Sequence, residues 1–232
     1  ASMCSIFGIL DIKTAADAQA LRPKALECSR LLRHRGPDWS GIYSNDNAIL
    51  VHERLSIVDT EHGAQPLYND DKSHVLAVNG EIYNHKQLAK DLSVNYEFKT
   101  ASDCEVILPL YEEFGVNFVD KLQGMFAFCV YNAEDNSYLI ARDHMGIIPL
   151  YTGVDEDGHF YVASEMKALM PICKTVEEFP PGHILDSKVG KLQKYYNRNW
   201  HKYDAIKDNT TSTTKIREAL EESVKSHLMT DV

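Results

Sequence analysis

Short apolar segments separated by turn-forming residues dominate the middle of the chain. Met125–Tyr131 and Tyr138–Arg142 flank Asn132–Asn136, which is the pattern of two strands joined as a hairpin. Similar spacing recurs along the chain, with few helical segments between. We therefore expect an α+β fold and not a parallel α/β sheet. Further strands are predicted at Ser5–Leu10, Trp39–Tyr43, Ala48–Arg54, His74–Asn79, Pro149–Gly153 and His159–Ala163, and as a short antiparallel pair around Ile184 and Leu192.

Helices are predicted where apolar residues recur at helical spacing. Leu21, Ala25, Cys28 and Leu32 have this spacing, which indicates a helix over about Ala18–Arg33. Other helices are predicted at His85–Asp91, Asp103–Phe114 and Ser164–Met170, and a last one carries Ile216, Leu220, Val224 and Leu228 along one face.

Charge and apolar content argue against several classes of protein. The 232 residues include 24 Lys and Arg against 34 Asp and Glu, and the net charge of −10 would repel a nucleic-acid backbone. The longest apolar run, Met125–Tyr131, is far shorter than the roughly 20 residues that span a bilayer, and no signal peptide is visible. Five scattered cysteines without a C-x-x-C pattern suit a reducing cytosol, so we expect a cytoplasmic protein.

Several common chemical motifs are missing from the sequence. It contains no G-x-G-x-x-G, no G-x-x-x-x-G-K, no H-E-x-x-H and no G-x-S-x-G. We therefore expect no phosphate loop of these types and no zinc site built from a short motif.

Cys4 is the first candidate for chemistry. It lies directly before a strand of buried type, and without Ala1–Met3 it would carry a free α-amino group. An α-amine has an unperturbed pKa of about 7.7–8.0, so it can act as the base that deprotonates its own thiol. The alternative is a cysteine that only packs in the first strand, which is also the role expected of Cys28, Cys104, Cys129 and Cys173.

Arg54 is the second candidate. Its neighbours Ala48–Val51 and Leu55 are mostly apolar, so its guanidinium must be paired or reach a cavity. In a cavity it would bind a carboxylate with two parallel hydrogen bonds. The alternative is a structural ion pair with Glu53, Asp59 or another acid.

Two further segments offer hydrogen-bonding groups. Asn79-Gly80-Glu81 follows a predicted strand, where a side-chain amide and a glycine N–H could form an oxyanion hole; a plain Asn-Gly turn is the alternative. Asp103 could accept hydrogen bonds from a substrate ammonium group, although Ser102 or Asp103 could equally cap the following helix. Arg54 and Asp103 together would hold both charged groups of an amino acid.

These residues lie in segments that resemble a known family. The chain is similar to the glutaminase domain of class II glutamine amidotransferases, and its sequence motifs most resemble those of the bacterial glutamine-hydrolysing asparagine synthetases. The similar segments are Cys4-Ser-Ile-Phe-Gly8, Arg33-His-Arg-Gly-Pro-Asp38, His52-Glu-Arg-Leu-Ser-Ile-Val-Asp59, Gln65-Pro-Leu-Tyr68, Val78-Asn-Gly-Glu-Ile-Tyr-Asn84, Ser102-Asp-Cys-Glu105, Gly124-Met-Phe-Ala-Phe128, Arg142-Asp-His-Met-Gly146 and Ala163-Ser-Glu-Met-Lys167.

The resemblance implies an N-terminal-nucleophile hydrolase fold, a four-layer α/β/β/α sandwich with two stacked antiparallel sheets. It implies hydrolysis of L-glutamine to glutamate and ammonia, with Cys4 as nucleophile and its α-amine as general base. Asn79 and Gly80 would form the oxyanion hole, and Arg35–Asp38 a structural loop near the site. The residues that would bind glutamine are Arg54, Leu55, Ser56, Ile57, Val58, Asn79, Gly80, Glu81 and Asp103.

The resemblance also divides the chain. Residues 1–3 are expected to be an artificial leader, residues 4–205 the glutaminase domain, and residues 206–232 a linker and helix leading toward a synthetase domain. A retained Met3 would turn the amine into an amide, so we expect weak hydrolysis from the chain as written. The glutaminase needs no cofactor or metal, and ATP and Mg²⁺ are expected only in the synthetase domain.

The resemblance implies three partners: L-glutamine, the synthetase domain of the same polypeptide and a second copy in a homodimer. Two alternatives stay open: the glutaminase domain of another class II amidotransferase, or a non-catalytic domain that binds glutamine for regulation.

Overall fold

Two antiparallel sheets of six strands each form the frame of the protein. They lie within residues 4–55 and 65–228, the part of the chain that the computed structural model describes. The first sheet comprises β1 (Ser5–Leu10), β2 (Trp39–Ser44), β3 (Ile49–Arg54), β8 (Tyr151–Val154), β9 (Phe160–Ala163) and β10 (Thr175–Glu178), in the order β10-β8-β9-β1-β3-β2. The second comprises β4 (Leu67–Tyr68), β5 (His74–Ile82), β6 (Gly124–Asn132), β7 (Tyr138–Arg142), β11 (His183–Asp186) and β12 (Lys191–Lys194), in the order β12-β11-β7-β6-β5-β4.

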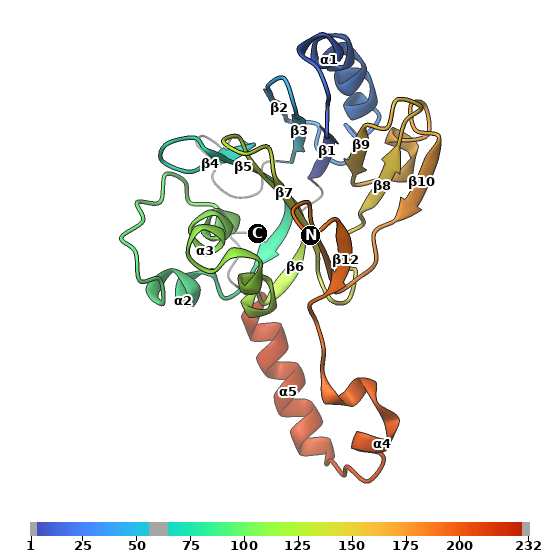
Figure 1. The fold of residues 1–232 in the computed structure, drawn as a ribbon. Coiled ribbons are helices and arrows are strands. Elements are labelled where there is room, and N and C mark those ends of the chain that lie inside the picture. Colours follow the sequence, from blue (N-terminus) through green and yellow to red (C-terminus); the bar gives the residue numbers. More distant parts are fainter. Residues whose placement is uncertain (1–3, 56–64, 229–232) are drawn as a thin grey trace.

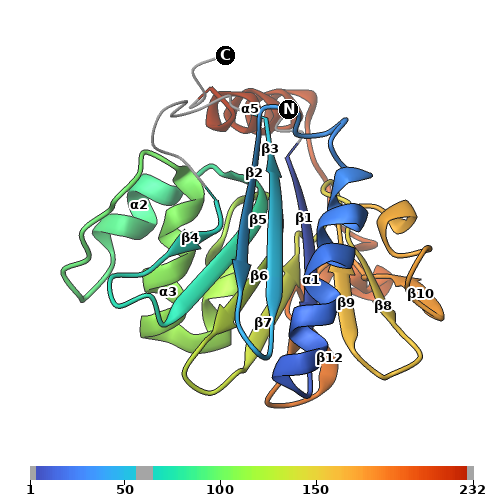
Figure 2. The same cartoon turned by 90° about the horizontal axis from the view of Figure 1, so that it is seen from above.

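Helices cover the outer face of each sheet, as Figures 1 and 2 show. The first sheet packs against α1 (Ala15–Arg30), which begins after Thr14, whose hydroxyl accepts a hydrogen bond from the N–H of Asp17. The second sheet packs against helical segments that follow β5 in sequence. These are α2 (His85–Lys90), η1 (Asp103–Val106), α3 (Ile107–Phe114) and η2 (Gly115–Lys121). The layers are therefore helix, sheet, sheet and helix, as the resemblance implied.

The last elements lie largely outside these layers. They are η4 (Asn199–His201), α4 (Tyr203–Ile206) and α5 (Thr213–Ser226), of which α5 projects from the sandwich in Figure 1. The short segment η3 (Met166–Ala168), between β9 and β10, instead packs against the first sheet, with Ala168 buried in the same cluster as α1. The apolar face of α5 is more than half exposed, and His227 beyond its end stacks on Tyr83 with ring centroids 4.2 Å apart. No helix in the described ranges is long and apolar enough to cross a membrane.

Strand alternation decides which side chains meet between the two sheets. Ile6 and Leu50 of the first sheet contact Val75 and Ala77 of the second in one buried cluster. Phe7 and the other odd-numbered residues of β1 and β3 point the opposite way, toward α1. Even-numbered residues of β1 and β3 therefore face odd-numbered residues of β5. The candidate site depends on this pattern.

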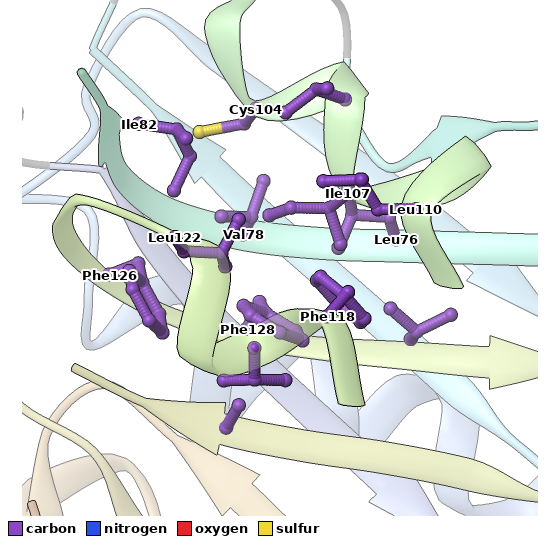
Figure 3. Close-up of a cluster of buried hydrophobic side chains, with 14 of the residues drawn as sticks. Leu76, Val78, Ile82, Cys104, Ile107, Leu110, Phe118, Leu122, Phe126 and Phe128 are labelled. Carbon is purple, nitrogen blue, oxygen red and sulfur yellow. The ribbon is translucent and has the colours of Figure 1, made fainter. Parts of the chain in front are cut away.

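The outer face of the second sheet carries a large aromatic cluster. Figure 3 shows Phe118 from the helical segments next to Phe126 and Phe128 of β6, together with Ile107 and Leu76. The rings of Phe118 and Phe128 are stacked with centroids 6.0 Å apart. All of these side chains are at most 1% exposed, so this cluster anchors the helical layer to β5 and β6.

Most predicted elements are present, and the hairpin of β6 and β7 and the pair of β11 and β12 are confirmed. Three predictions are wrong in detail. Ser164–Met170 contains only the short 3-10 segment η3, the Asp103–Phe114 helix begins as the 3-10 segment η1, and α1 begins and ends three residues earlier than predicted, at Ala15 and Arg30. The sequence analysis also missed β4 and β10, because strands of two and four residues produce little alternation to detect.

Removing the ring of Phe128 tests the packing of the second sheet. We expect Phe128→Ala to lower the free energy of unfolding by about 3–5 kcal/mol, because a fully buried phenylalanine leaves a cavity in the core. The matched control is Leu192→Ala in the same sheet, whose side chain is half exposed and whose loss should change stability by at most about 0.5 kcal/mol. Urea unfolding measures both, and equal losses would contradict the assigned core.

Candidate active site

Cys4 lies at the beginning of β1, opposite the end of β3. The register pairs Ser5 with Glu53, which places Cys4 beside Arg54 and Leu55. The Cys4 Sγ accepts from the N–H of Leu55 at 3.4 Å and lies 3.6 Å from the Leu55 carbonyl oxygen, to which it donates. The side chain is 8% exposed, so the thiol is held at the edge of the inter-sheet layer.

Arg35 fixes the backbone of Cys4 from the loop that follows α1. Its Nε donates to the carbonyl oxygen of Cys4 at 3.2 Å, and its Nη1 lies 3.0 Å from Glu165 Oε1. Glu165 also contacts His34 and Lys167. Burial raises the pKa of its carboxyl, but the hydrogen bonds from Arg35, His34 and Lys167 together hold this pKa below its usual value. The loop from Arg35 to Asp38 is thus adjacent to the candidate nucleophile, as the resemblance implied.

Arg54 occupies the inward face at the end of β3. Its side chain is 8% exposed, and strand alternation places it on the same face as His52, whose imidazole reaches β5. Glu53, suggested above as its ion-pair partner, points to the other face. There its carboxylate accepts from the hydroxyls of Ser29, at 2.6 Å, and Ser40. The other suggested partner, Asp59, lies outside the described residues.

Asn79 and Gly80 lie within β5 and do not form a turn. Asn79 pairs with Ala127 and Gly80 with Phe126 of β6, so the predicted strand continues to Ile82. The Asn79 side chain is fully buried on the face that meets the first sheet, and neither its oxygen nor its nitrogen has a hydrogen-bond partner among the described residues. A buried amide without a partner is costly, which is typical of a group that binds a ligand.

Gly80 has a backbone conformation that only glycine tolerates here. Its φ is +151°, and a Cβ atom would lie 2.2 Å from the carbonyl oxygen of Met125. The antiparallel ladder alternates, so the N–H of Gly80 points away from β6, to the same edge of β5 as that of Val78. This edge therefore presents an amide N–H next to the side-chain amide of Asn79.

Asp103 is the first residue of η1, and its side chain contacts β5 at Ile82, two residues after Gly80. Its Oδ2 accepts from the N–H of Ile82 at 2.5 Å, while the hydroxyl of Ser102 accepts from the N–H of Cys104. The capping role therefore belongs to Ser102. Burial raises the pKa of Asp103 above its usual value, although the hydrogen bond from Ile82 and the nearby His85 oppose this.

Cys104 shows that the candidate residues are close together. Its thiol donates to the carbonyl oxygen of Gly80 at 3.4 Å. Burial raises its pKa well above the usual value, and the charges of Asp103, Cys4 and Glu81 raise it further. Cys104, which belongs to the cluster on the outer face of the second sheet, therefore lies near residues that are distant from it in sequence.

The remaining predicted residues divide into two groups. Leu55 contacts Cys4, and Glu81 follows Gly80 on β5. Burial, together with the smaller effect of the charge on Glu81, raises the pKa of Tyr83 to about 12. Ser56, Ile57 and Val58 lie outside the described residues. Among the described residues, Cys28, Cys104 and Cys129 are buried, as expected for packing cysteines, and Cys173 is half-buried.

His52 is the polar residue that the sequence analysis did not single out. It is fully buried on β3, and its Nε2 lies 3.0 Å from the carbonyl oxygen of Val78 on β5. Because a carbonyl only accepts, Nε2 must carry the proton. Burial lowers the pKa of His52 to about 4, with a small contribution from Arg54, so the ring is neutral at pH 7. A histidine at an inward position of an otherwise apolar strand was the available signal.

One group of side chains has a geometry suited to a metal ion. Ligand atoms of Asp155, Asp157 and His159 lie within 4.8 Å of one another. The Asp155 Oδ2 is already bound at 2.8 Å by His159 Nδ1 and by the hydroxyl of Tyr161. This cluster closes the turn between β8 and β9, at the end of β1 away from Cys4. We assign it a structural role.

Comparison with known proteins connects this geometry with one chemistry. Residues 3–189 match the family described as a glutamine amidotransferase domain. The glutamine-hydrolyzing asparagine synthetase B of Escherichia coli (strain K12) is 65% identical over 99% of this chain and 41% of that protein. The glutamine-hydrolyzing asparagine synthetase 1 of Arabidopsis thaliana is 48% identical over 99% of this chain and 39% of that protein. The chain thus spans about two fifths of the length of these relatives.

Solved structures share the fold. The glutamine phosphoribosylpyrophosphate amidotransferase from B. subtilis aligns with a TM-score of 0.67 at 23% identity, over 84% of this chain and 50% of that one. An allosteric regulatory enzyme of purine biosynthesis aligns with a TM-score of 0.65, also at 23% identity, over the same shares of the two chains. Both similarities support the stacked-sheet architecture.

The neutral, buried state of His52 predicts how stability depends on pH. The unfolded chain binds a proton near pH 6.5, whereas the folded chain binds it only near pH 4, so stability is lost as the pH falls between these values. At about 1.4 kcal/mol for each factor of ten in proton affinity, the loss is about 3 kcal/mol. Because glutamine does not titrate, the free energy of unfolding of His52→Gln should fall by about 3 kcal/mol less between pH 7 and pH 4 than that of the unsubstituted chain, as measured by urea unfolding. Parallel pH profiles for the two chains would contradict the neutral, buried imidazole.

Proposed function

The chain belongs to the glutamine amidotransferase domain family, and from this membership we propose that it hydrolyses L-glutamine to glutamate and ammonia with Cys4 as the nucleophile. One observation carries the proposal. The thiol of Cys4, just before β1, and the amide of Asn79 on β5, which has no hydrogen-bond partner among the described residues, belong to facing sides of the two sheets. Arg54 ends the strand beside Cys4, and Asp103 binds the strand that carries Asn79.

The proposed binding mode uses the two charged groups of glutamine. The guanidinium of Arg54 binds the α-carboxylate, and the carboxylates of Asp103 and Glu81 bind the α-ammonium. Leu55, which contacts Cys4, lies beside the side chain of the bound substrate. Held in this way, glutamine directs its carboxamide toward Cys4.

The proposed reaction proceeds through a thioester. The α-amine of Cys4 takes the thiol proton, and the thiolate forms a bond to the carboxamide carbon. The side-chain N–H of Asn79 and the backbone N–H of Gly80 stabilise the oxyanion. The resulting ammonium returns the proton to the nitrogen, the C–N bond breaks and ammonia leaves. Water, activated by the same amine, then hydrolyses the thioester to glutamate.

This mechanism requires a free amine on Cys4. In the 232-residue sequence that nitrogen is bonded to Met3, and an amide nitrogen is not a base. We therefore propose that the active form begins at Cys4. The mechanism needs no cofactor or metal, because the thiol, the amine and the hydrogen-bond donors supply each step.

The relatives suggest where the ammonia goes. They are glutamine-hydrolyzing asparagine synthetases, and this chain spans about two fifths of their length. We propose that residues 206–232 lead toward a synthetase domain of the same polypeptide, which would use ATP and Mg²⁺ to combine the ammonia with aspartate. We propose a homodimer on the basis of family membership, and analytical ultracentrifugation tests it. We propose a cytoplasmic location on the basis of the free cysteines, and cell fractionation tests it.

Freeing the amine of Cys4 tests the nucleophile and its base. We expect a chain that begins at Cys4 to release glutamate at least about 100-fold faster than the 232-residue chain, because general-base catalysis contributes about 10²–10⁴-fold. A glutamine-like diazoketone should label the shorter chain once, at Cys4, as measured by mass spectrometry. Cys4→Ala should abolish labelling and hydrolysis, whereas the control Cys129→Ala, in a fully buried position, should retain both.

Two results would decide against this account. Equal, fast hydrolysis by the two chain lengths would refute the free-amine mechanism. Glutamine binding without hydrolysis or labelling would instead favour a non-catalytic binding domain.

Replacing Arg54 tests the proposed carboxylate contact. We expect Arg54→Lys to raise the KM for glutamine about 10- to 100-fold with a smaller effect on kcat, because a paired, charge-assisted hydrogen bond of roughly 1.5–3 kcal/mol is lost from substrate binding. Arg198→Lys, at a largely exposed ion pair with Asp120, is the matched control and should leave both constants unchanged. An unchanged KM in Arg54→Lys would contradict the assignment.

A further inference from the structure

One residue beside the proposed oxyanion hole has both backbone polar groups bound by side chains. The N–H of Val78 donates to Gln65 Oε1 at 3.1 Å, and its carbonyl oxygen accepts from His52 Nε2 at 3.0 Å. β4 pairs with β5 only as far as Leu76, so a strand does not supply these partners in the described part of the chain. Side chains from outside the sheet therefore continue the ladder at this position.

The hydrogen bond from His52 connects the two sheets. His52 belongs to β3 and pairs with Ile6 of β1, whose side chain lies in the apolar layer between the sheets. Its Nδ1 is buried without a partner in residues 4–55 and 65–228, so within these ranges no second hydrogen bond orients the ring. Burial of a polar ring with one unsatisfied nitrogen is destabilising, and an apolar side chain would pack there at lower cost.

The segment that follows Val78 lies close to the neighbouring strand and is bound by side chains at both ends. Gly80 has a φ of +151° and lies against the backbone of Met125. After it, Asp103 binds the N–H of Ile82 at 2.5 Å. Before it, His52 binds the carbonyl of Val78. The two donors of the proposed oxyanion hole therefore lie between two backbone positions that side chains bind. One of these side chains, His52, comes from the first sheet, and the other, Asp103, comes from the helical layer on the second sheet.

We propose that His52 is a positioning residue for glutamine hydrolysis: as a neutral Nε2–H imidazole it holds the carbonyl of Val78 and thereby places Asn79 and Gly80 opposite Cys4. Because β3 also carries Arg54, the same bond ties the carboxylate-binding strand to the oxyanion-binding strand. His52 itself does not touch the substrate. This inference rests on the proposed function for its effect on rate, but its structural part can be tested without activity.

Two substitutions separate the hydrogen bond from the space that the ring fills. His52→Phe keeps a flat ring of similar size and removes the donor, whereas His52→Gln keeps an N–H donor that can reach Val78. The matched control is His159→Phe, at a second buried histidine that binds Asp155 at the far end of β1. All variants are made in the chain that begins at Cys4.

The kinetic readout is the division between kcat and KM. We expect His52→Phe to lower kcat about 10- to 100-fold, because loss of an oxyanion donor costs about 10²–10³-fold and here the donors are displaced, not removed. The KM for glutamine should stay within about threefold. His52→Gln should restore kcat to within about threefold of the unsubstituted chain, and His159→Phe should leave kcat unchanged per folded molecule. Unchanged kcat in His52→Phe, or an equal loss in His159→Phe, would overturn the proposal.

The structural readout is nitrogen NMR of the unsubstituted chain and the variants. At pH 7 we expect His52 to show a protonated Nε2 and an unprotonated Nδ1. The amide signals of Asn79 and Gly80 should shift in His52→Phe and keep their positions in His52→Gln and His159→Phe. A charged ring, the other tautomer or unshifted amides would overturn the proposal. If the unsubstituted chain shows this tautomer but does not hydrolyse glutamine, the proposed function fails and the structural link from His52 to Val78 stands.

Discussion

The candidate site depends on the short pairing between β4 and β5. β4 contributes only Leu67 and Tyr68 to the ladder, so beyond Leu76 the N–H and C=O groups of alternate β5 residues lie at a sheet edge with which no described strand pairs. An unpaired edge between two packed sheets is costly unless other groups bind it. Gln65 and His52 bind Val78, and Asp103 binds Ile82. Between these anchors the side chain of Asn79 is buried with no hydrogen-bond partner in the part of the chain that the structure describes.

The two sheets supply different parts of the proposed chemistry. The first sheet carries Cys4 and Arg54 on the inward faces of neighbouring strands, and Arg35 fixes the backbone of Cys4. The second sheet carries Asn79 and Gly80, with Asp103 from the helical layer behind it. Nucleophile and oxyanion donors therefore meet only when the sheets stack in the correct alignment. The apolar inter-sheet cluster and the bond from His52 to Val78 set that alignment.

Much of this arrangement was predictable from the sequence, for identifiable reasons. Hairpin spacing predicted the antiparallel strands around Asn132–Asn136, and an unusual combination of Cys4, Arg54, Asn79 and Asp103 in family order predicted the site. Local patterns failed where tertiary contacts decide the conformation. Asn79-Gly80 resembles a turn in isolation, but pairing with β6 keeps it in a strand. The role of His52 was not visible, because its partner is a backbone carbonyl in the other sheet.

The central claim is that Cys4 attacks a carboxamide whose oxygen lies between Asn79 and Gly80. A crystal structure of the chain beginning at Cys4, with a glutamine-like diazoketone bound covalently to the thiol, measures this directly. The account predicts that the ketone-derived oxygen lies about 2.7–3.1 Å from both Asn79 Nδ2 and Gly80 N. An adduct on Cys4 whose oxygen points away from β5, or an adduct on another residue, would contradict it.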